Sequence, residues 1–391
     1  MKRAVVLGMA RSGQAAAALL ERHGVEVVRV DRTLGNDDDV SLLEGADVLV
    51  KSPGVSRDNA LVREARIPIW SEVELGYRLL PNPIIGVTGT NGKTTTVEWL
   101  RAMFRAAGRE VAVAGNVGRA LTGVDAAPDA WIVCELSSFQ LEDVHEFRPG
   151  VAVLINLEPD HLDRHGTFEA YRDAKLRIFD RQSAEDTAVV PHGFAPVGGR
   201  ARRVEFGATD ALPVEPALPG LHNRENAAAA TAAARAAGLP DDAIAEALRS
   251  FPGVAHRLEL VAEVGGVRFV NDSKATNSAA ARRALAAYEV PVHVILGGSR
   301  KGESFDELAA EVHGRAYLIG ETAAELAAAL DRAGVPYIQC GELAAAVAAA
   351  AQAARAGEVV LLSPACASYD QFQDFEHRGE EFRRLVQNLS G

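Results

Sequence analysis

Short apolar stretches alternate with longer helix-like stretches along most of this chain of 391 residues. AVVLG, IIGVTG, VAVLIN, VHVILGG and EVVLLSP have the length and β-branched content of buried strands, and helix-like runs such as AAAALLERHG separate them. Two neighbouring parallel strands need a long crossover between them, which a helix usually supplies. The alternation therefore predicts an α/β fold with mainly parallel sheets.

Two proline-containing breaks divide the chain. Its 391 residues exceed the length at which a single hydrophobic core normally stops growing. The segment LPNP at 80–83 disfavours both helix and central strand, and FPG at 251–253 follows two helix-like stretches. We therefore expect three domains, at residues 1–82, 83–252 and 253–391.

The charge and the apolar tracts exclude some classes of protein. The 53 acidic and 41 basic residues give a formal net charge of -12, which argues against a nucleic-acid-binding surface. The longest weakly polar tract, at 343–354, is too short to span a bilayer. Arg11 interrupts the apolar run at the start, which favours a first strand over a signal peptide. Cys134, Cys340 and Cys366 lack the spacing of a disulfide frame or a zinc site, so a reducing cytoplasm is expected.

The stretch GVTGTNGKTTT at 86–96 follows a predicted strand and opens a predicted helix. It matches the phosphate-loop template except that valine replaces the first glycine. Gly89 and Gly92 let backbone amides turn inward, and the helix start adds its partial positive charge. Lys93 can reach terminal phosphates, and Thr94 can bind magnesium. The stretch therefore predicts a nucleotide site.

Three further residues follow predicted strands or lie on a predicted helix. Glu135 ends the strand WIVCE, where an α/β sheet presents its site, although a solvated strand-end glutamate is the alternative. His161 lies in the loop after VAVLIN, where a histidine is often only solvated. Lys175 is four residues from both Tyr171 and Phe179, which places it on the apolar face of a helix. A desolvated lysine is neutral enough to take up carbon dioxide as a carbamate, but the residues alone favour an ammonium that reaches water along its stem.

Several longer stretches together resemble one enzyme family, the Mur ligases. TGTNGKTT is shared by that whole superfamily, including the folylpolyglutamate synthetases. More specific stretches are similar to the members that add D-glutamate: CELSSFQLE at 134–142, LPGLHNREN at 218–226, HRLE at 256–259, NDSKATN at 271–277 and SPACASYDQFQDFEHRGEEF at 363–382. One departure is the stretch 181–217, which is shorter than in many family members but contains none of these motifs.

The resemblance implies a fold and a reaction. The expected domains are a Rossmann-like UDP-binding domain at 1–82, a P-loop ATP-binding domain at 83–252 and a Rossmann-like amino-acid-binding domain at 253–391. ATP would phosphorylate the carboxylate of UDP-N-acetylmuramoyl-L-alanine, and the amine of D-glutamate would attack the acyl phosphate. This is a cytoplasmic step of peptidoglycan precursor synthesis, expected of a monomer that binds neither nucleic acid nor a membrane.

The resemblance also implies roles for individual residues. The expected catalytic residues are Lys93, Glu135, His161 and Lys175. Two Mg²⁺ ions are expected on Thr94, Glu135, His161 and carbamylated Lys175, which reverses the preference for a solvated ammonium. The residues expected to bind ATP are Gly89, Thr90, Asn91, Gly92, Lys93, Thr94, Thr95, Asn223, Asn226, Arg257 and Asp272.

The two other substrates have their own sets of residues. Those expected to bind the UDP precursor are Arg11, Ser12, Asp31, Arg32, Ser52, Pro53, Gly54, Asn116 and Ser137. Those expected to hold D-glutamate are His161, Lys274, Thr276, Lys301, Ser368 and Phe375; lysines suit a dicarboxylate because charge-assisted hydrogen bonds are strong.

Three other functions stay open on the sequence. One is a ligase of the same superfamily that adds another amino acid or glutamylates a folate. Another is a nucleotide-controlled switch or kinase, which has no need of a second metal at Lys175. A dehydrogenase would rest only on GMARSG at 8–13, where Ala10 replaces the second glycine of the dinucleotide fingerprint.

Overall fold

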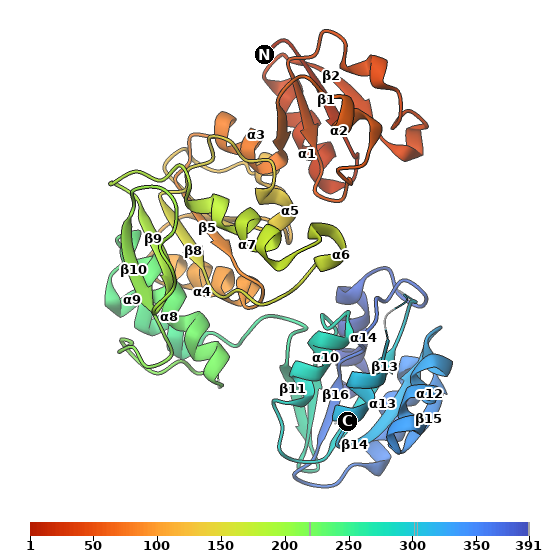
Figure 1. Cartoon of the computed structure of the whole chain (residues 1–391). Coiled ribbons are helices and arrows are strands. Elements are labelled where there is room, and N and C mark those ends of the chain that lie inside the picture. The colour runs from red at the N-terminus through yellow and green to blue at the C-terminus, as the bar shows by residue number, and fades with distance from the viewer. Residues whose placement is uncertain (219, 301, 303, 390–391) are drawn as a thin grey trace. The chain divides into compact units, whose positions relative to one another are not determined.

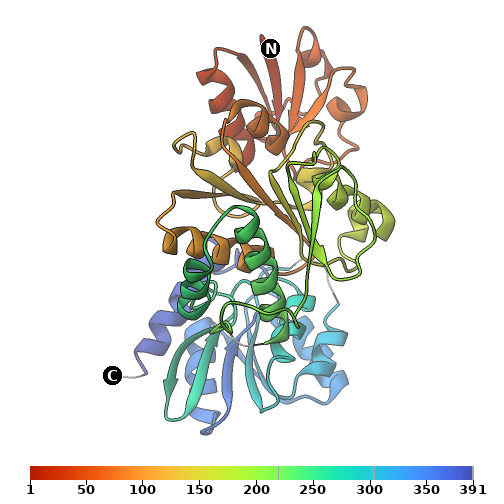
Figure 2. The same cartoon turned by 90° about the vertical axis from the view of Figure 1, so that its left-hand side faces the viewer.

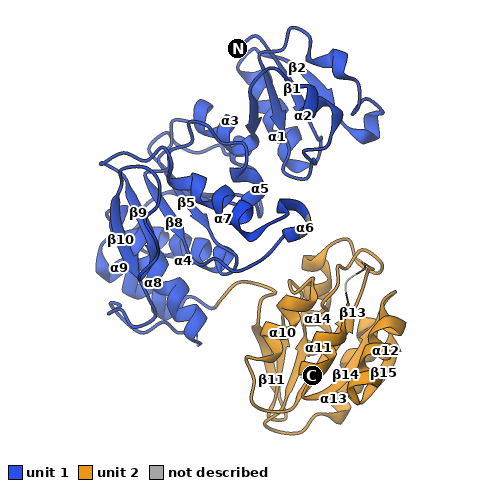
Figure 3. Ribbon diagram, viewed as in Figure 1, with its two compact units in different colours: residues 1–252 blue, residues 253–391 orange. Residues whose placement is uncertain are grey.

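The chain forms two compact units, Met1–Pro252 and Gly253–Gly391 (Figure 3). The structure, a computed structural model, describes residues 1–389 apart from 219, 301 and 303. The first unit contains two sheets and the second contains one. The limits of the three expected domains stay a prediction.

The N-terminal sheet of the first unit is parallel, with the strand order β2-β1-β3-β4 (Figure 1). Its strands are β1 (Arg3–Leu7), β2 (Glu26–Val30), β3 (Val48–Lys51) and β4 (Ile69–Ser71). The helices of this section are α1 (Arg11–Arg22), η1 (Arg32–Leu34), η2 (Val40–Leu43), α2 (Ala60–Glu64) and α3 (Glu72–Leu79). β1 is the strand expected at the start of the chain, and four of its five residues are buried.

The second sheet of this unit is also parallel, with the order β10-β9-β8-β5-β7-β6. Its strands are β5 (Ile84–Thr88), β6 (Val111–Gly115), β7 (Trp131–Glu135), β8 (Val151–Leu154), β9 (Thr187–Pro191) and β10 (Arg202–Phe206). The helices are α4 (Lys93–Ala106), η3 (Leu121–Gly123), α5 (Ser138–Leu141), α6 (Leu162–His165), α7 (Phe168–Leu176), η4 (Arg177–Phe179), α8 (Leu221–Ala236) and α9 (Asp241–Ser250). Helices α4, α8 and α9 pack together (Figure 2), while Leu141 and Phe179 belong to the core that includes Ile84, Ile132 and Ala152 of the sheet.

The register of the second sheet brings three strand ends to one edge. Val87 of β5 pairs with Glu135 of β7, and Thr88 pairs with Leu154 of β8. Because all three strands run parallel, the loops that follow them leave from the same edge. The phosphate loop, Glu135 and the His161 loop are therefore neighbours.

The second unit has a six-stranded sheet with the order β11-β12-β16-β13-β14-β15. Its strands are β11 (Glu259–Val264), β12 (Val267–Asn271), β13 (Val292–Gly297), β14 (Gly314–Ile319), β15 (Tyr337–Gly341) and β16 (Val359–Leu362). Its helices are α10 (Ser278–Leu285), α11 (Asp306–Glu311), α12 (Ala323–Ala333), α13 (Leu343–Ala353) and α14 (Phe375–Gln387). The sheet is buried on both faces, since Val294 and Ile295 of β13 belong to different apolar clusters.

The α/β class and the mainly parallel sheets are confirmed. The edge strand β11 is an exception because it runs antiparallel to β12, to which it is joined by the short turn Gly265-Gly266. Cys134, Cys340 and Cys366 are free thiols. In the described part of the chain, no helix has both the length and the apolar character needed to cross a membrane.

Candidate functional site

The phosphate loop connects β5 to α4 and requires glycine at Gly92. This residue has a φ of 81°, in the left-handed region, and it caps the N-terminus of α4. A Cβ atom at Gly92 would lie 2.1 Å from Oδ1 of Asn226, a buried residue of α8. The loop is also tied to the end of β8, since the backbone N of Asn91 donates to Oδ1 of Asn156 at 2.9 Å. The turn is therefore held from two sides.

Lys93 and Thr94 begin helix α4 and face the loop and its neighbour Glu135. Lys93 Nζ donates to the carbonyl oxygens of Gly89 and Thr90 at 2.8 and 2.9 Å. Thr94 Oγ1 donates to Oε2 of Glu135 at 2.8 Å. The helix N-terminus and the ammonium together give this loop a positive potential suited to phosphate groups.

Asn116 contacts the other oxygen of the same carboxylate. Its Nδ2 donates to Oε1 of Glu135 at 3.2 Å, and its backbone N donates to the Glu135 carbonyl at 2.8 Å. Glu135 is 3% exposed. Both carboxylate oxygens are thus fixed in place beside the loop.

Lys175 reaches the phosphate loop from helix α7. Thr167 caps this helix by accepting a hydrogen bond from the backbone N of Ala170 at 3.2 Å. Lys175 is only 2% exposed, and its Nζ donates to the carbonyl oxygen of Gly89 at 2.9 Å. Burial, reinforced by the charge of Lys93, lowers the pKa of the Lys175 amine to about 6. At neutral pH the amine is therefore mostly uncharged and nucleophilic.

Tyr171 supports both Lys175 and the loop. Lys175 Nζ lies 4.8 Å from the centre of the Tyr171 ring. The Tyr171 hydroxyl is 3.0 Å from Oγ1 of Thr90. Burial raises the pKa of this hydroxyl to about 12, so the phenol keeps its proton.

His161 is more exposed to solvent than Glu135 and Lys175. It is the N-cap of α6 with a φ of 52°, and its side chain is half exposed. Its ring centre lies 4.9 Å from that of Phe139, and its Nε2 lies 3.6 Å from Oδ2 of Asp160.

These side chains fit a nucleotide with its metal. Mg²⁺ prefers oxygen ligands, and the Thr94 hydroxyl, the Glu135 carboxylate and a carbamate on Lys175 would each offer oxygen. Within the described residues no group of three or more His, Cys, Asp or Glu side chains could hold a metal. A cation here would therefore depend on the hydroxyl, the carbamate and phosphate oxygens as well.

A pocket of about 560 Å³ lies at the carboxyl edge of the N-terminal sheet. Asp31, Arg32 and Gly54, three of the residues expected to bind the UDP precursor, line it. The Asp31 carboxylate accepts a hydrogen bond from the backbone N of Met9 at 2.6 Å, and this bond lowers its pKa. Ser52 Oγ donates to the Gly8 carbonyl at 2.7 Å, which holds the turn beside the pocket.

The other residues expected to bind the UDP precursor lie around this pocket or at the central sheet. Arg11 and Ser12 begin α1, and Arg11 donates to the carbonyl of Gly118 at 2.8 Å. Pro53 lies between Ser52 and Gly54. Ser137 caps α5 through a capping box with Gln140. Together with Asn116 it belongs to the central section.

The second unit contains residues that are expected to bind ATP and residues that are expected to hold D-glutamate. Asp272 is buried and accepts hydrogen bonds from Ser363 Oγ at 2.8 Å and from the backbone N of Leu258 at 3.2 Å. Burial raises the pKa of its carboxyl to about 7, although the charge of Arg257 opposes this. Lys274 Nζ lies 5.9 Å from the centre of the Phe375 ring.

Thr276 and Ser368 are the other described residues of the second unit that are expected to hold D-glutamate. The backbone N of Thr276 donates to the Lys274 carbonyl at 2.9 Å, and Ser368 is buried. Lys301 lies outside the described residues.

Of the residues expected to bind ATP, Thr95 is buried in α4 and Asn223 lies in the first turn of α8. Arg257 and Asp272 belong to the second unit.

Sequence reasoning missed Asn156 and Glu158. Asn156 accepts from the backbone N of Asn91, and Glu158 Oε2 accepts from Nδ2 of Asn91 at 2.9 Å. Asn156 ends the run VAVLIN, so its position after a buried strand was the available signal. Both residues fix the shape of the phosphate loop.

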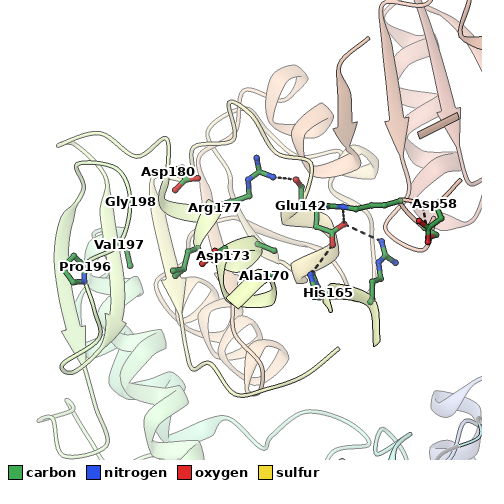
Figure 4. A pocket seen from close by; sticks show the side chains of 15 residues that line it. Asp58, Glu142, His165, Ala170, Asp173, Arg177, Asp180, Pro196, Val197 and Gly198 are labelled. Carbon is green, nitrogen blue, oxygen red and sulfur yellow. Dashed lines mark hydrogen bonds and ion pairs between the residues drawn. The ribbon is translucent and has the colours of Figure 1, made fainter. Parts of the chain in front are cut away.

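A larger cavity of about 740 Å³ lies on another side of α7 (Figure 4). It is lined by residues such as Asp58, Glu142, His165 and Asp173, and by none of the four expected catalytic residues. We place the candidate active site at the phosphate loop instead, because the reactive groups converge there.

Comparisons with known proteins show the family of the chain. Residues 87–195 match the model of the Mur ligase middle domain, and residues 256–366 match that of the Mur ligase glutamate ligase domain. The UDP-N-acetylmuramoylalanine–D-glutamate ligase of Acidobacterium capsulatum is 40% identical, over 98% of this chain and 96% of its own length.

Solved structures share the fold. The UDP-N-acetylmuramate–alanine ligase MurC of Thermotoga maritima aligns with a TM-score of 0.62 at 20% identity, covering 99% of each chain. A bifunctional folylpolyglutamate synthase/dihydrofolate synthase of Yersinia pestis, complexed with AMPPNP and a Mn ion, aligns with a TM-score of 0.58 at 20% identity. That alignment covers 80% of this chain and 92% of the other.

Proposed function

The chain belongs to the Mur ligase family, and from this premise we propose how its residues carry out an ATP-dependent ligation. It is the ligase that joins D-glutamate to UDP-N-acetylmuramoyl-L-alanine in peptidoglycan precursor synthesis. The single observation that supports the site is the convergence of Lys93, Thr94, Glu135 and Lys175 on one glycine turn.

The proposed reaction proceeds through an acyl phosphate. The alanine carboxylate of the precursor attacks the γ-phosphorus of ATP, and ADP leaves. The D-glutamate amine then attacks the activated carbonyl, loses a proton, and phosphate leaves as the amide forms. In such a reaction the protein mainly aligns the reactants and balances their negative charge.

The phosphate loop performs the charge balance in this proposal. Lys93 turns from the carbonyls of Gly89 and Thr90 toward the terminal phosphates, and the amides at the start of α4 face the same groups. Asn226, packed against Gly92, and Asn223 lie on the same helix and would face the adenine side. Thr90, Asn91 and Thr95 keep the loop in shape.

Carbamylated Lys175, Thr94, Glu135 and His161 would hold two Mg²⁺ ions. Bound Mg²⁺ would supply positive charge that offsets the negative charge of the reactants. The neutral amine of Lys175 supports the carbamate, because only an uncharged amine reacts with carbon dioxide. Carbamylation would replace a repulsive cation with an oxygen ligand.

The remaining residues would bind the two other substrates. The pocket at Asp31, Arg32 and the turn 52–54 would take the uridine, with Arg11 and Ser12 beside it and Asn116 and Ser137 toward the sugar. The residues proposed to bind D-glutamate are His161 in the first unit and Lys274, Thr276, Lys301, Ser368 and Phe375 in the second. The sections 1–82, 83–252 and 253–391 would then be the UDP-binding, ATP-binding and amino-acid-binding domains.

A phosphate-release assay tests the proposal. Release should require ATP, Mg²⁺, UDP-N-acetylmuramoyl-L-alanine and D-glutamate together. L-alanine, meso-diaminopimelate and L-glutamate serve as competing amino acids, and release with one of these instead of D-glutamate would contradict the substrate assignment. Lys93→Ala should abolish phosphate transfer, because the lysine is the loop's only side-chain cation among residues 86–96.

A further inference from the structure

A cluster of charged residues, buried at its centre, connects three segments of the first unit. We call it the Glu142 cluster; its members are Lys51, Arg57, Glu142, Asp143, Arg164 and His165. Lys51 ends β3, Glu142 and Asp143 follow α5, and Arg164 and His165 end α6. None of these residues belongs to the site described above.

Glu142 is the centre of the cluster. Its side chain is 4% exposed, and Lys51 Nζ, Arg57 Nε and Arg164 Nη2 lie 3.7, 3.4 and 3.8 Å from its Oε2. Its Oε1 lies 3.5 Å from Nδ1 of His165, toward which it points in Figure 4. Lys51 is 1% exposed and also lies 2.9 Å from Oδ2 of Asp143.

Hydrogen bonds extend the cluster into each segment. Arg164 Nη2 donates to the carbonyl oxygen of Val55 at 3.1 Å. His165 Nε2 is 3.0 Å from Oγ of Ser138, at the start of α5. The backbone N of Ser71 donates to the Asp143 carbonyl at 2.9 Å. The three segments are thus joined at several points.

Each segment carries residues that the proposed function uses. Lys51 directly precedes the turn 52–54, beside the pocket for uridine. Helix α5 begins after Ser137, two residues beyond Glu135. Helix α6 begins after His161. The cluster therefore joins the segment that carries the uridine turn to the segments that carry Glu135 and His161.

We propose that Glu142 is a positioning residue, which fixes the uridine turn relative to the His161 loop so that the UDP precursor spans both. This inference rests on the proposed function. The physical reason is that Lys51 and Arg164 are largely buried cations converging on one carboxylate. Removing its charge leaves Asp143, which contacts Lys51, as the one carboxylate of the cluster that balances these cations, in a region that water screens poorly.

The structure supplies a matched control in Glu74 of α3. Glu74 is fully buried and accepts hydrogen bonds from Nε of Arg78 at 2.6 Å and from the backbone N of His145 and Phe147. It is also a buried glutamate with an arginine partner, but it contacts neither the turn 52–55 nor α6. Glu74→Gln should therefore reduce stability without affecting one substrate more than another.

The test compares Glu142→Gln with Glu74→Gln in the full chain by steady-state kinetics and thermal unfolding. For Glu142→Gln we expect kcat/KM for the UDP precursor to fall about tenfold or more, as small misplacements of reacting groups cause. The KM for ATP should change less than about threefold, because the phosphate loop does not touch the cluster. Arg57→Ala should have little effect, since its side chain is 65% exposed.

The outcomes separate this inference from the proposed function. The positioning role is wrong if the wild-type enzyme ligates D-glutamate but Glu142→Gln changes the kinetic parameters for the UDP precursor and for ATP equally. It is also wrong if Glu142→Gln changes neither. If Glu142→Gln does not fold, Lys51→Met/Glu142→Gln, which removes a buried charge of each sign, receives the same measurements. If the wild-type enzyme does not ligate D-glutamate, the proposed function fails. Calorimetry with the UDP precursor then decides the positioning role, which requires weaker binding in Glu142→Gln than in Glu74→Gln.

Discussion

The position of the Lys175 side chain depends both on its spacing along helix α7 and on its tertiary neighbours. Helical spacing from Tyr171 predicted that it lies on the apolar face, and the structure confirms this with an exposure of 2%. Spacing alone favoured an ammonium that reaches water. The structure instead directs Nζ to the carbonyl of Gly89 in the phosphate loop. The direction of a long flexible side chain depends on its tertiary neighbours, which the sequence of one helix does not specify.

Lys175→Ala should be inactive and partly restored by short-chain carboxylic acids, since these can replace the carbamate in the space that the side chain leaves. Phosphate release with and without added acetate or propionate measures this. Lys93→Ala, which removes a different cation from the same loop, should not be restored. Absence of restoration in a folded Lys175→Ala enzyme that still binds nucleotide would count against the carbamate.

The low pKa of Lys175 also predicts how stability depends on pH. The folded amine has a pKa of about 6, whereas the ordinary pKa of lysine is 10.5. Between these values the folded protein binds fewer protons than the unfolded chain, so its stability falls as pH decreases from about 10 to about 6. Lys175→Met lacks this dependence. In buffer free of carbon dioxide, the Tm of the variant should rise relative to the Tm of the wild type as the pH falls toward 6. A difference in Tm that does not change with pH would contradict the lowered pKa of Lys175.

Gly92→Ala should abolish nucleotide binding. The added Cβ would meet Asn226 Oδ1 at 2.1 Å, and the φ of 81° would add strain. Gly108→Ala is the matched control, because Gly108 has a φ of 66° but nothing within 4 Å of the added atom. The control should lose about 1 kcal/mol of stability and keep its affinity for ATP. Equal ATP affinity of both variants, measured by calorimetry, would show that the loop tolerates the contact.

Among the elements, the three neighbouring strands β5, β7 and β8 define where the site lies. The sequence predicted the three strands and the role of Glu135 at the end of β7, because apolar runs and strand-end polar residues are local signals, but it missed Asn156 at the end of the β8 run. It did not predict the strand order β8-β5-β7, which brings Glu135 and Asn156 to the phosphate loop. The sequence also did not predict that β11 runs antiparallel to β12, because the direction of a strand depends on the partner with which it pairs.

Helix α7 gives a test at this scale. Thr167→Ala removes the cap that accepts from the backbone N of Ala170, and should cost about 1 kcal/mol of unfolding free energy. Fraying of the first turn should also lower activity, since α7 carries Lys175. Chemical denaturation and phosphate release measure the two effects. Thr167→Ser keeps a capping hydroxyl and should behave like the wild type; if it loses as much stability as Thr167→Ala, the cap is not the cause.

At the scale of the whole molecule, the chain consists of two compact units. The second unit has its own sheet and apolar clusters on both faces. Proline and glycine at 251–253 predicted a break there, because they interrupt the helical pattern that precedes them. The sequence could not show that the N-terminal and central sections form one compact unit, because contacts such as Lys51 with Asp143 join residues far apart in the chain.

We expect the fragment 253–391 to fold by itself. A six-stranded sheet covered on both faces buries enough apolar surface for an independent domain of this size. Circular dichroism should show mixed α/β structure and a cooperative thermal transition. The matched fragment 83–252 lacks the N-terminal section and with it Lys51, so we expect it to be less stable than the fragment 1–252. A non-cooperative transition of 253–391 would contradict its independence.

The sequence by itself determined the α/β class, the phosphate loop and the family, because these depend on local periodicity and on contiguous motifs. Tertiary structure decided which strand ends meet, where the Lys175 amine points and how Glu142 joins three segments. These features depend on strand order and on burial, and both arise only when distant parts of the chain pack together. The chemistry of each side chain is local, but the electrostatic environment that tunes it is not.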